Sequence, residues 1–154
     1  MSGLVVPFGT AVTPASAGWS YVGFEPLQLD GGPGVERDTG ERECCIVVVS
    51  GRVDIVSEHG DWRDLGSRAT PFEGAADAAY LPPGTRFTVS GTGEVGLCFA
   101  PAESGAEPRV LPGSAIAPET RGHGGVEVGG RRERHAREHL AGRGVGDVER
   151  LRVG

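Results

Sequence analysis

Lysine is absent from the sequence, and so is any long hydrophobic run. All 15 basic residues are arginine, a usage to which we attach no function. No stretch approaches the roughly 18 apolar residues of a transmembrane helix. Residues 1–10 have neither the basic nor the apolar region of a secretory signal. We therefore expect a cytoplasmic protein that has no membrane partner.

Cysteine is scarce as well, with three residues at positions 44, 45 and 98. An odd number that includes two neighbours is not typical of a disulfide framework. Adjacent side chains on a strand point to opposite faces, so Cys44 and Cys45 are not expected to pair. A catalytic thiol needs a base that lowers its pKa, and the sequence places no histidine beside these two residues. We interpret them as packing residues in a reducing compartment.

Positive charge is sparse over most of the chain. Residues 1–120 hold 7 Arg against 16 Asp and Glu, a net charge of −9, whereas residues 121–154 hold 8 Arg against 5 acids, a net charge of +3. An acidic body argues against a nucleic-acid surface on the main domain. In the tail the acids are interspersed with the arginines, so we expect no nucleic-acid partner there either.

Glycine and proline are abundant, with 27 and 11 residues, which argues against a helical bundle and favours short strands joined by turns. Apolar, β-branched and aromatic runs predict strands at residues 19–29, 43–49, 52–57, 62–65, 78–81, 86–90 and 95–100. We interpret Ser50-Gly51 and residues 91–93 as turns between paired strands. So many short strands without a helix indicate an antiparallel barrel or sandwich.

The composition changes after Pro101. Residues 109–111 are predicted as a last short strand, and residues 131–140 are the only predicted helix, with too few apolar residues to bury a face. We therefore place one domain at residues 1–120. Residues 121–154 form a Gly/Arg-rich connector that we expect to be irregular or short-helical.

The histidines do not form a recognisable metal motif. His135 and His139 are four residues apart, as in zinc-binding helices, but the glutamate of that motif is not in its place, so we interpret both as solvated. His59 stands in a turn beside Gly60 and is expected to be exposed. No residue of the chain is assigned as catalytic or metal-binding.

The order of turns and strands resembles the two linked motifs of cupin barrels. The first motif is Gly-x5-His-x-His followed by Glu and Gly, the second is Pro-x-Gly-x2-His, and their histidines and glutamate hold a divalent metal. Here Asp38, Gly40 and Phe87 fill the three histidine positions, and Glu43 stands at or near the glutamate. A lone aspartate and a lone glutamate make a poor transition-metal site.

A longer series of segments resembles the N-terminal half of the 5-deoxy-glucuronate isomerase family of bacterial inositol breakdown. These segments are residues 18–24 (GWSYVGF), 38–43 (DTGERE), 49–54 (VSGRVD) and 79–85 (AYLPPGT). Members of that family have two cupin barrels, of which the first is degenerate and the second holds the metal. The resemblance implies a sugar-acid aldose–ketose isomerase whose metal, a Lewis acid, belongs to a second barrel that is absent here.

We accordingly expect an all-β, jelly-roll-like cupin barrel that is inactive alone and has no cofactor of its own. Glu43 and Tyr80 are candidate residues of a remnant ligand pocket, although Glu43 equally fits an exposed strand charge. The expected partners are a sugar-acid ligand and either a second copy or a second cupin half, since open strand edges favour association. Two alternatives stay open: a non-catalytic module that binds a small ligand or a partner protein, and an enzyme whose site the sequence does not reveal.

Overall fold

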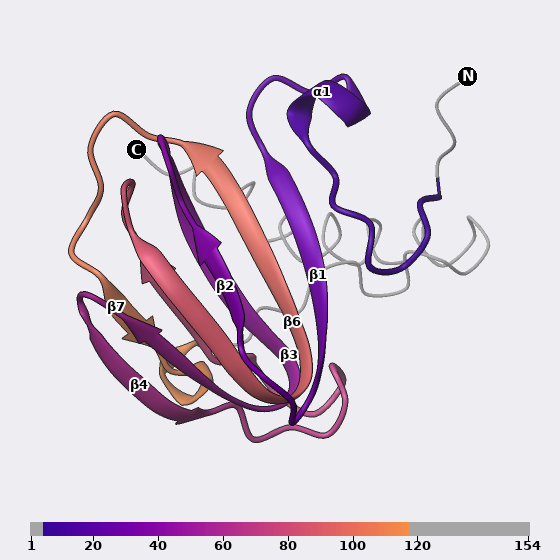
Figure 1. Cartoon of the computed structure of the whole chain (residues 1–154). Coiled ribbons are helices and arrows are strands. Elements are labelled where there is room, and N and C mark those ends of the chain that lie inside the picture. Colours follow the sequence, from indigo (N-terminus) through magenta and orange to yellow (C-terminus); the bar gives the residue numbers. More distant parts are fainter. Residues whose placement is uncertain (1–4, 118–154) are drawn as a thin grey trace, which may run out of the picture. The chain divides into compact units, whose positions relative to one another are not determined.

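The structure is a computed structural model that describes residues 5–117. Its elements are α1 Pro14–Ala17, β1 Gly23–Asp30, β2 Val35–Asp38, β3 Arg42–Ser57, β4 Gly60–Leu65, β5 Ala78–Leu81, β6 Arg86–Pro101, β7 Arg109–Leu111 and the 3-10 turn η1 Gly113–Ala115 (Figure 1). The strands pair antiparallel in one seven-stranded sheet. The predicted all-β antiparallel architecture is therefore confirmed for this part of the chain.

Two 16-residue strands, β3 and β6, form the centre of the sheet and pair with each other along almost their whole lengths. On the free edges of this pair, β5 pairs with the first half of β3 and β1 pairs with the second half of β6. β7 extends the sheet beyond β5. β4 pairs with the second half of β3, and β2 pairs with the first half of β6. Because the core contains side chains from both halves, the long β3–β6 ribbon wraps around a single interior (Figure 1).

The prediction of turns at Ser50-Gly51 and at residues 91–93 is wrong, because both segments lie inside continuous strands. Gly51 has φ +85° and stands opposite Gly93, which has φ +136°. A Cβ added to Gly51 would come within 2.0 Å of the Thr92 carbonyl oxygen. Glycine here lets two long strands bend at close approach, and its presence alone does not distinguish such a bend from a turn.

Several shorter elements also differ from the prediction. The predicted strand at residues 19–29 begins only at Gly23, and β2 was not predicted because its four residues are mostly polar. The one-turn helix α1 was missed too; Thr13 and Ser16 form a capping box at its start. In contrast, β5 and β7 have the predicted bounds.

Apolar side chains fill the interior of the barrel. The core consists of Leu27, Leu29, Cys44, Ile46, Val48, Val53, Ile55, Ala79, Leu81, Phe87, Val89, Val95, Leu97 and Phe99. Along β3, Cys44, Ile46 and Val48 are at most 1% exposed, and the residues between them face outward. The interior is thus a packed core, as in other small barrels whose side chains fill the lumen.

No helix within residues 5–117 has the length and apolar character needed to cross a membrane. The cytoplasmic location stays a prediction. The predicted helix at residues 131–140, the histidines within it and the connector at residues 121–154 lie outside the described residues, and the boundary near residue 120 stays a prediction as well.

Candidate functional site

The positions at which cupin barrels carry metal ligands do not converge in this structure. Asp38 is exposed at the end of β2, and its Oδ1 accepts a hydrogen bond of 2.7 Å from the Gly40 N–H. Phe87 is in the core with 1% of its surface exposed, and Glu43 faces outward because its neighbour Cys44 faces the core. Among residues 5–117 no three His, Cys, Asp or Glu side chains are placed to hold a metal ion. The divalent metal that the cupin resemblance implies therefore does not fit these positions.

Two buried threonines join the loops of the two motifs. Thr39 Oγ1 donates to the Pro82 carbonyl oxygen at 2.9 Å and accepts from the Thr85 N–H at 2.8 Å. Thr85 Oγ1 donates to the same Pro82 oxygen at 2.9 Å, and the Thr39 N–H donates to the Thr85 carbonyl oxygen at 3.0 Å. Both threonines are at most 1% exposed. The network fastens the motifs to each other by hydrogen bonds within the chain.

His59 adds to this network from the turn between β3 and β4. Its Nε2 lies 3.1 Å from Thr85 Oγ1. When the Thr85 hydroxyl donates to the Pro82 oxygen, the His59 tautomer with hydrogen on Nε2 donates to Thr85 Oγ1. His59 is exposed, as the sequence predicted, and its side chain keeps 33% of its surface in solvent. Its contact was not predictable, since it joins residues 26 positions apart.

The two predicted pocket residues meet on the outer face of the sheet. The Tyr80 hydroxyl donates to Glu43 Oε2 at 2.8 Å and accepts from the Ala106 N–H at 3.0 Å. The Arg109 guanidinium lies 5.6 Å from the centre of the Tyr80 ring. Burial raises the pKa of Tyr80 above its ordinary value, and Glu43 adds to the rise. These contacts tie the loop after β6 to the sheet; a role of the pair in binding a ligand stays a prediction.

An open pocket of about 870 Å³ lies beside the motif loops and is acidic. It is lined by Tyr21, Gly40, Glu41, Pro83, Gly84, Pro101, Ala102 and Glu103. Its two charged residues are Glu41 and Glu103, and both are exposed. A sugar acid carries a carboxylate of its own, so these two side chains disfavour its binding here.

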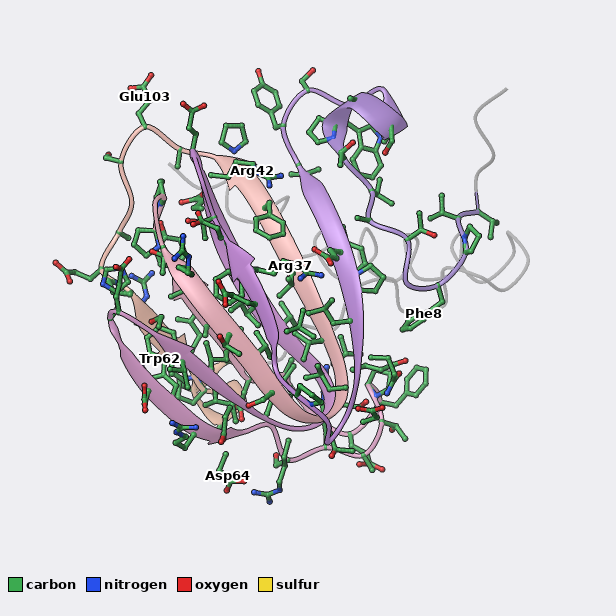
Figure 2. The ribbon with its side chains drawn as sticks, viewed as in Figure 1. Phe8, Arg37, Arg42, Trp62, Asp64 and Glu103 are labelled. Carbon is green, nitrogen blue, oxygen red and sulfur yellow. The ribbon has the colours of Figure 1, made fainter. Side chains whose placement is uncertain are left out.

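A smaller pocket of about 190 Å³ contains two arginines from β2 and β3 (Figure 2). Arg37 Nε donates to both carboxylate oxygens of Glu25 at 3.1 Å, and this hydrogen bonding raises the pKa of Arg37. The Arg42 guanidinium lies 4.5 Å from the centre of the Phe99 ring. The pocket is below the size of ordinary ligand sites, and one of its two cations is already neutralised.

The three cysteines occupy both faces of the sheet. Cys44 lies in the core, while Cys45 and Cys98 stand opposite each other in the β3–β6 pair with their side chains outward. Burial raises the pKa of all three thiols. A raised pKa keeps a thiol protonated at neutral pH, which is the opposite of what a nucleophilic cysteine requires.

A sequence profile of the KduI/IolB family matches residues 7–154. The chain belongs to this family. Relatives within the KduI/IolB family include the 5-deoxy-glucuronate isomerase of Geobacillus thermodenitrificans (strain NG80-2), 34% identical over 119 residues, and that of Listeria monocytogenes serotype 4a (strain HCC23), 29% identical over 115 residues. The matches cover 75% and 72% of this chain but only 43% and 42% of these relatives. The chain thus spans less than half their length.

The KduI/IolB assignment agrees with the fold. The crystal structure of an IolB-like protein from Salmonella typhimurium LT2 is similar to this chain with a TM-score of 0.70 and 30% sequence identity. The similarity covers 75% of this chain and 46% of the Salmonella protein. The suspected family and the all-β, cupin-like fold are therefore confirmed.

Proposed function

We propose that this chain is the structural half of a sugar-acid isomerase of the 5-deoxy-glucuronate isomerase kind, and that it has no isomerase activity alone. Relatives that carry this name match it over less than half of their length. The substrate carbonyl would be polarised and its proton moved in the other half of such an enzyme. This half supplies a folded barrel and a surface against which the other half packs.

The burial of Phe87 is the observation that supports this proposal most. It stands where the second cupin motif has a metal-binding histidine, yet it is 1% exposed within a core of apolar side chains. A carbonyl substrate needs a cavity with polar groups that fix its orientation. A packed interior offers neither the space nor the donors.

The alternative of a small-ligand module has less support than that of a partner-binding module. The largest pocket described above is open and acidic, and the arginine pocket is small. By contrast, seven large apolar side chains between residues 5 and 24 are at least 41% exposed. Exposed apolar groups of this kind favour contact with another protein.

The test compares two proteins in one isomerase assay with 5-deoxy-glucuronate. The first is the purified chain, supplied in turn with manganese, iron, nickel and zinc salts. The second is a fusion in which this chain replaces the matched part of the Geobacillus thermodenitrificans isomerase. We expect no turnover above buffer for the chain alone and measurable turnover for the fusion.

Turnover by the chain alone would contradict the proposal, because it would require a complete site within these residues. A fusion that is folded and binds metal but stays inactive would also count against it. The isolated second half of the Geobacillus protein serves as the matched control, since its own turnover sets the level that the fusion must exceed.

A further inference from the structure

Large apolar side chains are exposed mainly near the start of the described chain. Between residues 5 and 24, seven of them are at least 41% exposed: Val5, Val6, Phe8, Trp19, Tyr21, Val22 and Phe24. Scattered apolar side chains are normal on a protein surface, whereas a contiguous group marks an interaction site. Three of the seven, Val6, Phe8 and Phe24, line one groove and so form such a group.

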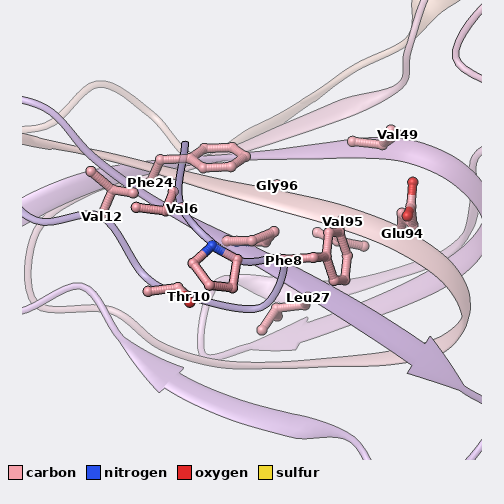
Figure 3. Close-up of a pocket in the computed structure, with 12 residues that line it drawn as sticks. Val6, Phe8, Thr10, Val12, Phe24, Leu27, Val49, Glu94, Val95 and Gly96 are labelled. Carbon is pink, nitrogen blue, oxygen red and sulfur yellow. The ribbon is translucent and has the colours of Figure 1, made fainter. Parts of the chain in front are cut away.

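The N-terminal segment lies beside β1 and encloses an apolar groove (Figure 3). Val12 and Phe24 exchange two backbone hydrogen bonds of 2.7 and 2.8 Å, which attach the segment to the sheet edge. The groove has a volume of about 300 Å³ and is lined by Val6, Pro7, Phe8, Thr10, Val12, Phe24, Pro26, Leu27, Val49, Glu94, Val95 and Gly96. Of these residues Glu94 alone is charged, so the groove suits an apolar protein surface.

The apolar surface continues from the groove across the sheet. Cys98 stands opposite Phe24 on one side and Cys45 on the other, and Cys45 stands opposite Tyr80. These side chains share the outer face, since residue 99 and its register partner Cys44 face the core. We call the groove together with Cys45 and Cys98 the apolar outer face.

The loop between β4 and β5 holds a further exposed phenylalanine, Phe72. Arg68 donates to two carbonyl oxygens of its own loop and to that of Val48 at 3.4 Å, and its carbonyl oxygen accepts from the Gly51 N–H at 2.9 Å. The loop is thus fastened beside Val49, which lines the groove. It nevertheless leaves Phe72 94% exposed. An ordered loop that holds a phenyl ring in water is suited to place that ring against a partner.

We infer that the apolar outer face is the docking surface for the second half of a KduI/IolB-type isomerase. The inference rests on the proposed function and names the surface that it requires. More than half of each curated relative described above lies beyond the part that matches this chain. The unmatched part is long enough to form a second domain that covers the groove and the cysteine pair.

Charge favours the second half over a second copy of this chain. The whole chain carries a net charge of −6, so two copies repel each other. In a two-fold symmetric contact the same patch meets itself, which would bring the Glu94 side chains of both copies into an otherwise apolar interface. The surface of a second half is a different sequence, so it need not place a carboxylate opposite Glu94.

Cys98 is a natural reporter for this interface, because it lies on the face and is exposed. The experiment measures alkylation of each cysteine by N-ethylmaleimide, with peptide mass spectrometry, in the chain alone and in the fusion with the Geobacillus second half. We expect the Cys98 rate to fall at least about tenfold in the fusion. Cys44, which is buried in the core, should stay unreactive in both proteins and so reports that the barrel is folded.

Two variants of the fusion locate the contact. Phe8→Ser, at a 65% exposed residue that lines the groove, should return the Cys98 rate toward that of the chain alone. Tyr21→Ser is the matched control, since Tyr21 is a 70% exposed aromatic residue that lines the acidic pocket instead of the groove. It should leave Cys98 protected.

Unchanged Cys98 reactivity in a fusion whose Cys44 is protected would overturn the inference. So would a chain that forms dimers alone, with Cys98 protected at high concentration, because the occupant would then be a second copy. If Cys44 reacts in the fusion, the halves are purified separately and mixed, and the absence of a complex in sedimentation velocity overturns the inference. An active fusion with unprotected Cys98 refutes the docking surface alone, and an inactive fusion with protected Cys98 refutes the proposed function alone.

Discussion

Replacement of Thr39 by valine tests the hydrogen-bond network that joins the two motif loops. Valine has the shape of threonine, so the change removes the hydroxyl without leaving a cavity. Thr39 Oγ1 both donates to the Pro82 oxygen and accepts from the buried Thr85 N–H. Thr85 is the internal comparison, because it is equally buried and its hydroxyl contacts the same oxygen.

The two valine variants should differ in stability. In Thr39→Val the Thr85 N–H loses its acceptor inside the protein, at a cost of about 1–3 kcal/mol, and one of two donors to Pro82 is lost, at about 0.5–1.5 kcal/mol. We therefore expect a loss of about 2–4 kcal/mol. In Thr85→Val the Pro82 oxygen keeps the Thr39 donor, and water replaces the contact of the exposed His59, so the expected loss is about 0.5–1.5 kcal/mol.

Equilibrium urea unfolding, followed by tryptophan fluorescence and circular dichroism, measures this difference. The slope of the free energy of unfolding against urea should be unchanged, so that the midpoints report stability directly. Thr39→Ser keeps both hydrogen bonds, loses one methyl group and should cost about 1 kcal/mol. The reasoning is refuted if Thr39→Val is no less stable than Thr85→Val, because the network would then not depend on the acceptor that Thr39 provides.

Three further predictions concern the bend of the sheet, the buried thiol and the lost motif histidine. Gly51→Ala should lower the free energy of unfolding by about 3 kcal/mol or more, because the new Cβ would clash with the backbone of the paired strand. Gly84→Ala is the comparison: Gly84 also has a positive φ, +78°, but open space around it, so the expected loss is about 1–2 kcal/mol. Equal losses of the two variants in thermal unfolding would contradict the close approach of the strands at Gly51. Burial raises the pKa of Cys44 above that of a thiol in the unfolded chain, which is about 8.5. The buried, protonated thiol therefore contributes its full stabilisation below about pH 8.5, and this stabilisation is lost as the pH rises further. The free energy of unfolding should then fall by up to about 1.4 kcal/mol per pH unit above about 8.5, and Cys44→Ala should flatten that part of the curve. Phe87→His should cost about 2–4 kcal/mol without creating a metal site; stoichiometric zinc or manganese in elemental analysis of this variant would show that the ligand positions do converge.

The alternating and apolar runs of the sequence were enough to predict an all-β fold, but not the lengths of its strands. Strands β5 and β7 were predicted with their observed bounds because proline or glycine lies on their flanks. The long strands β3 and β6 were each divided in two at glycine. Glycine is required at positions 51 and 93 because the two backbones approach closely across the strand pair. The sequence does not show this requirement, since the approach arises only when the two strands are paired.

The candidate site shows the same limit. Glu43 and Tyr80 were singled out, and they do meet, but the alternation of β3 places them outside the barrel. Thr39 and Thr85 were not singled out, since an isolated threonine beside a turn gives no signal of burial. Their importance arises from hydrogen bonds between residues 46 positions apart.

The sequence by itself determined the family, the all-β class and the replacement of the metal-binding histidines at Asp38, Gly40 and Phe87, because these follow from residue identity and order. The tertiary structure decided which face each side chain occupies. A strand presents alternate residues to opposite faces, and a shift of one residue would exchange the core for the surface. Only the register of the β3–β6 pair could therefore show that Phe87 fills the core and that Cys45 stands opposite Cys98 outside it.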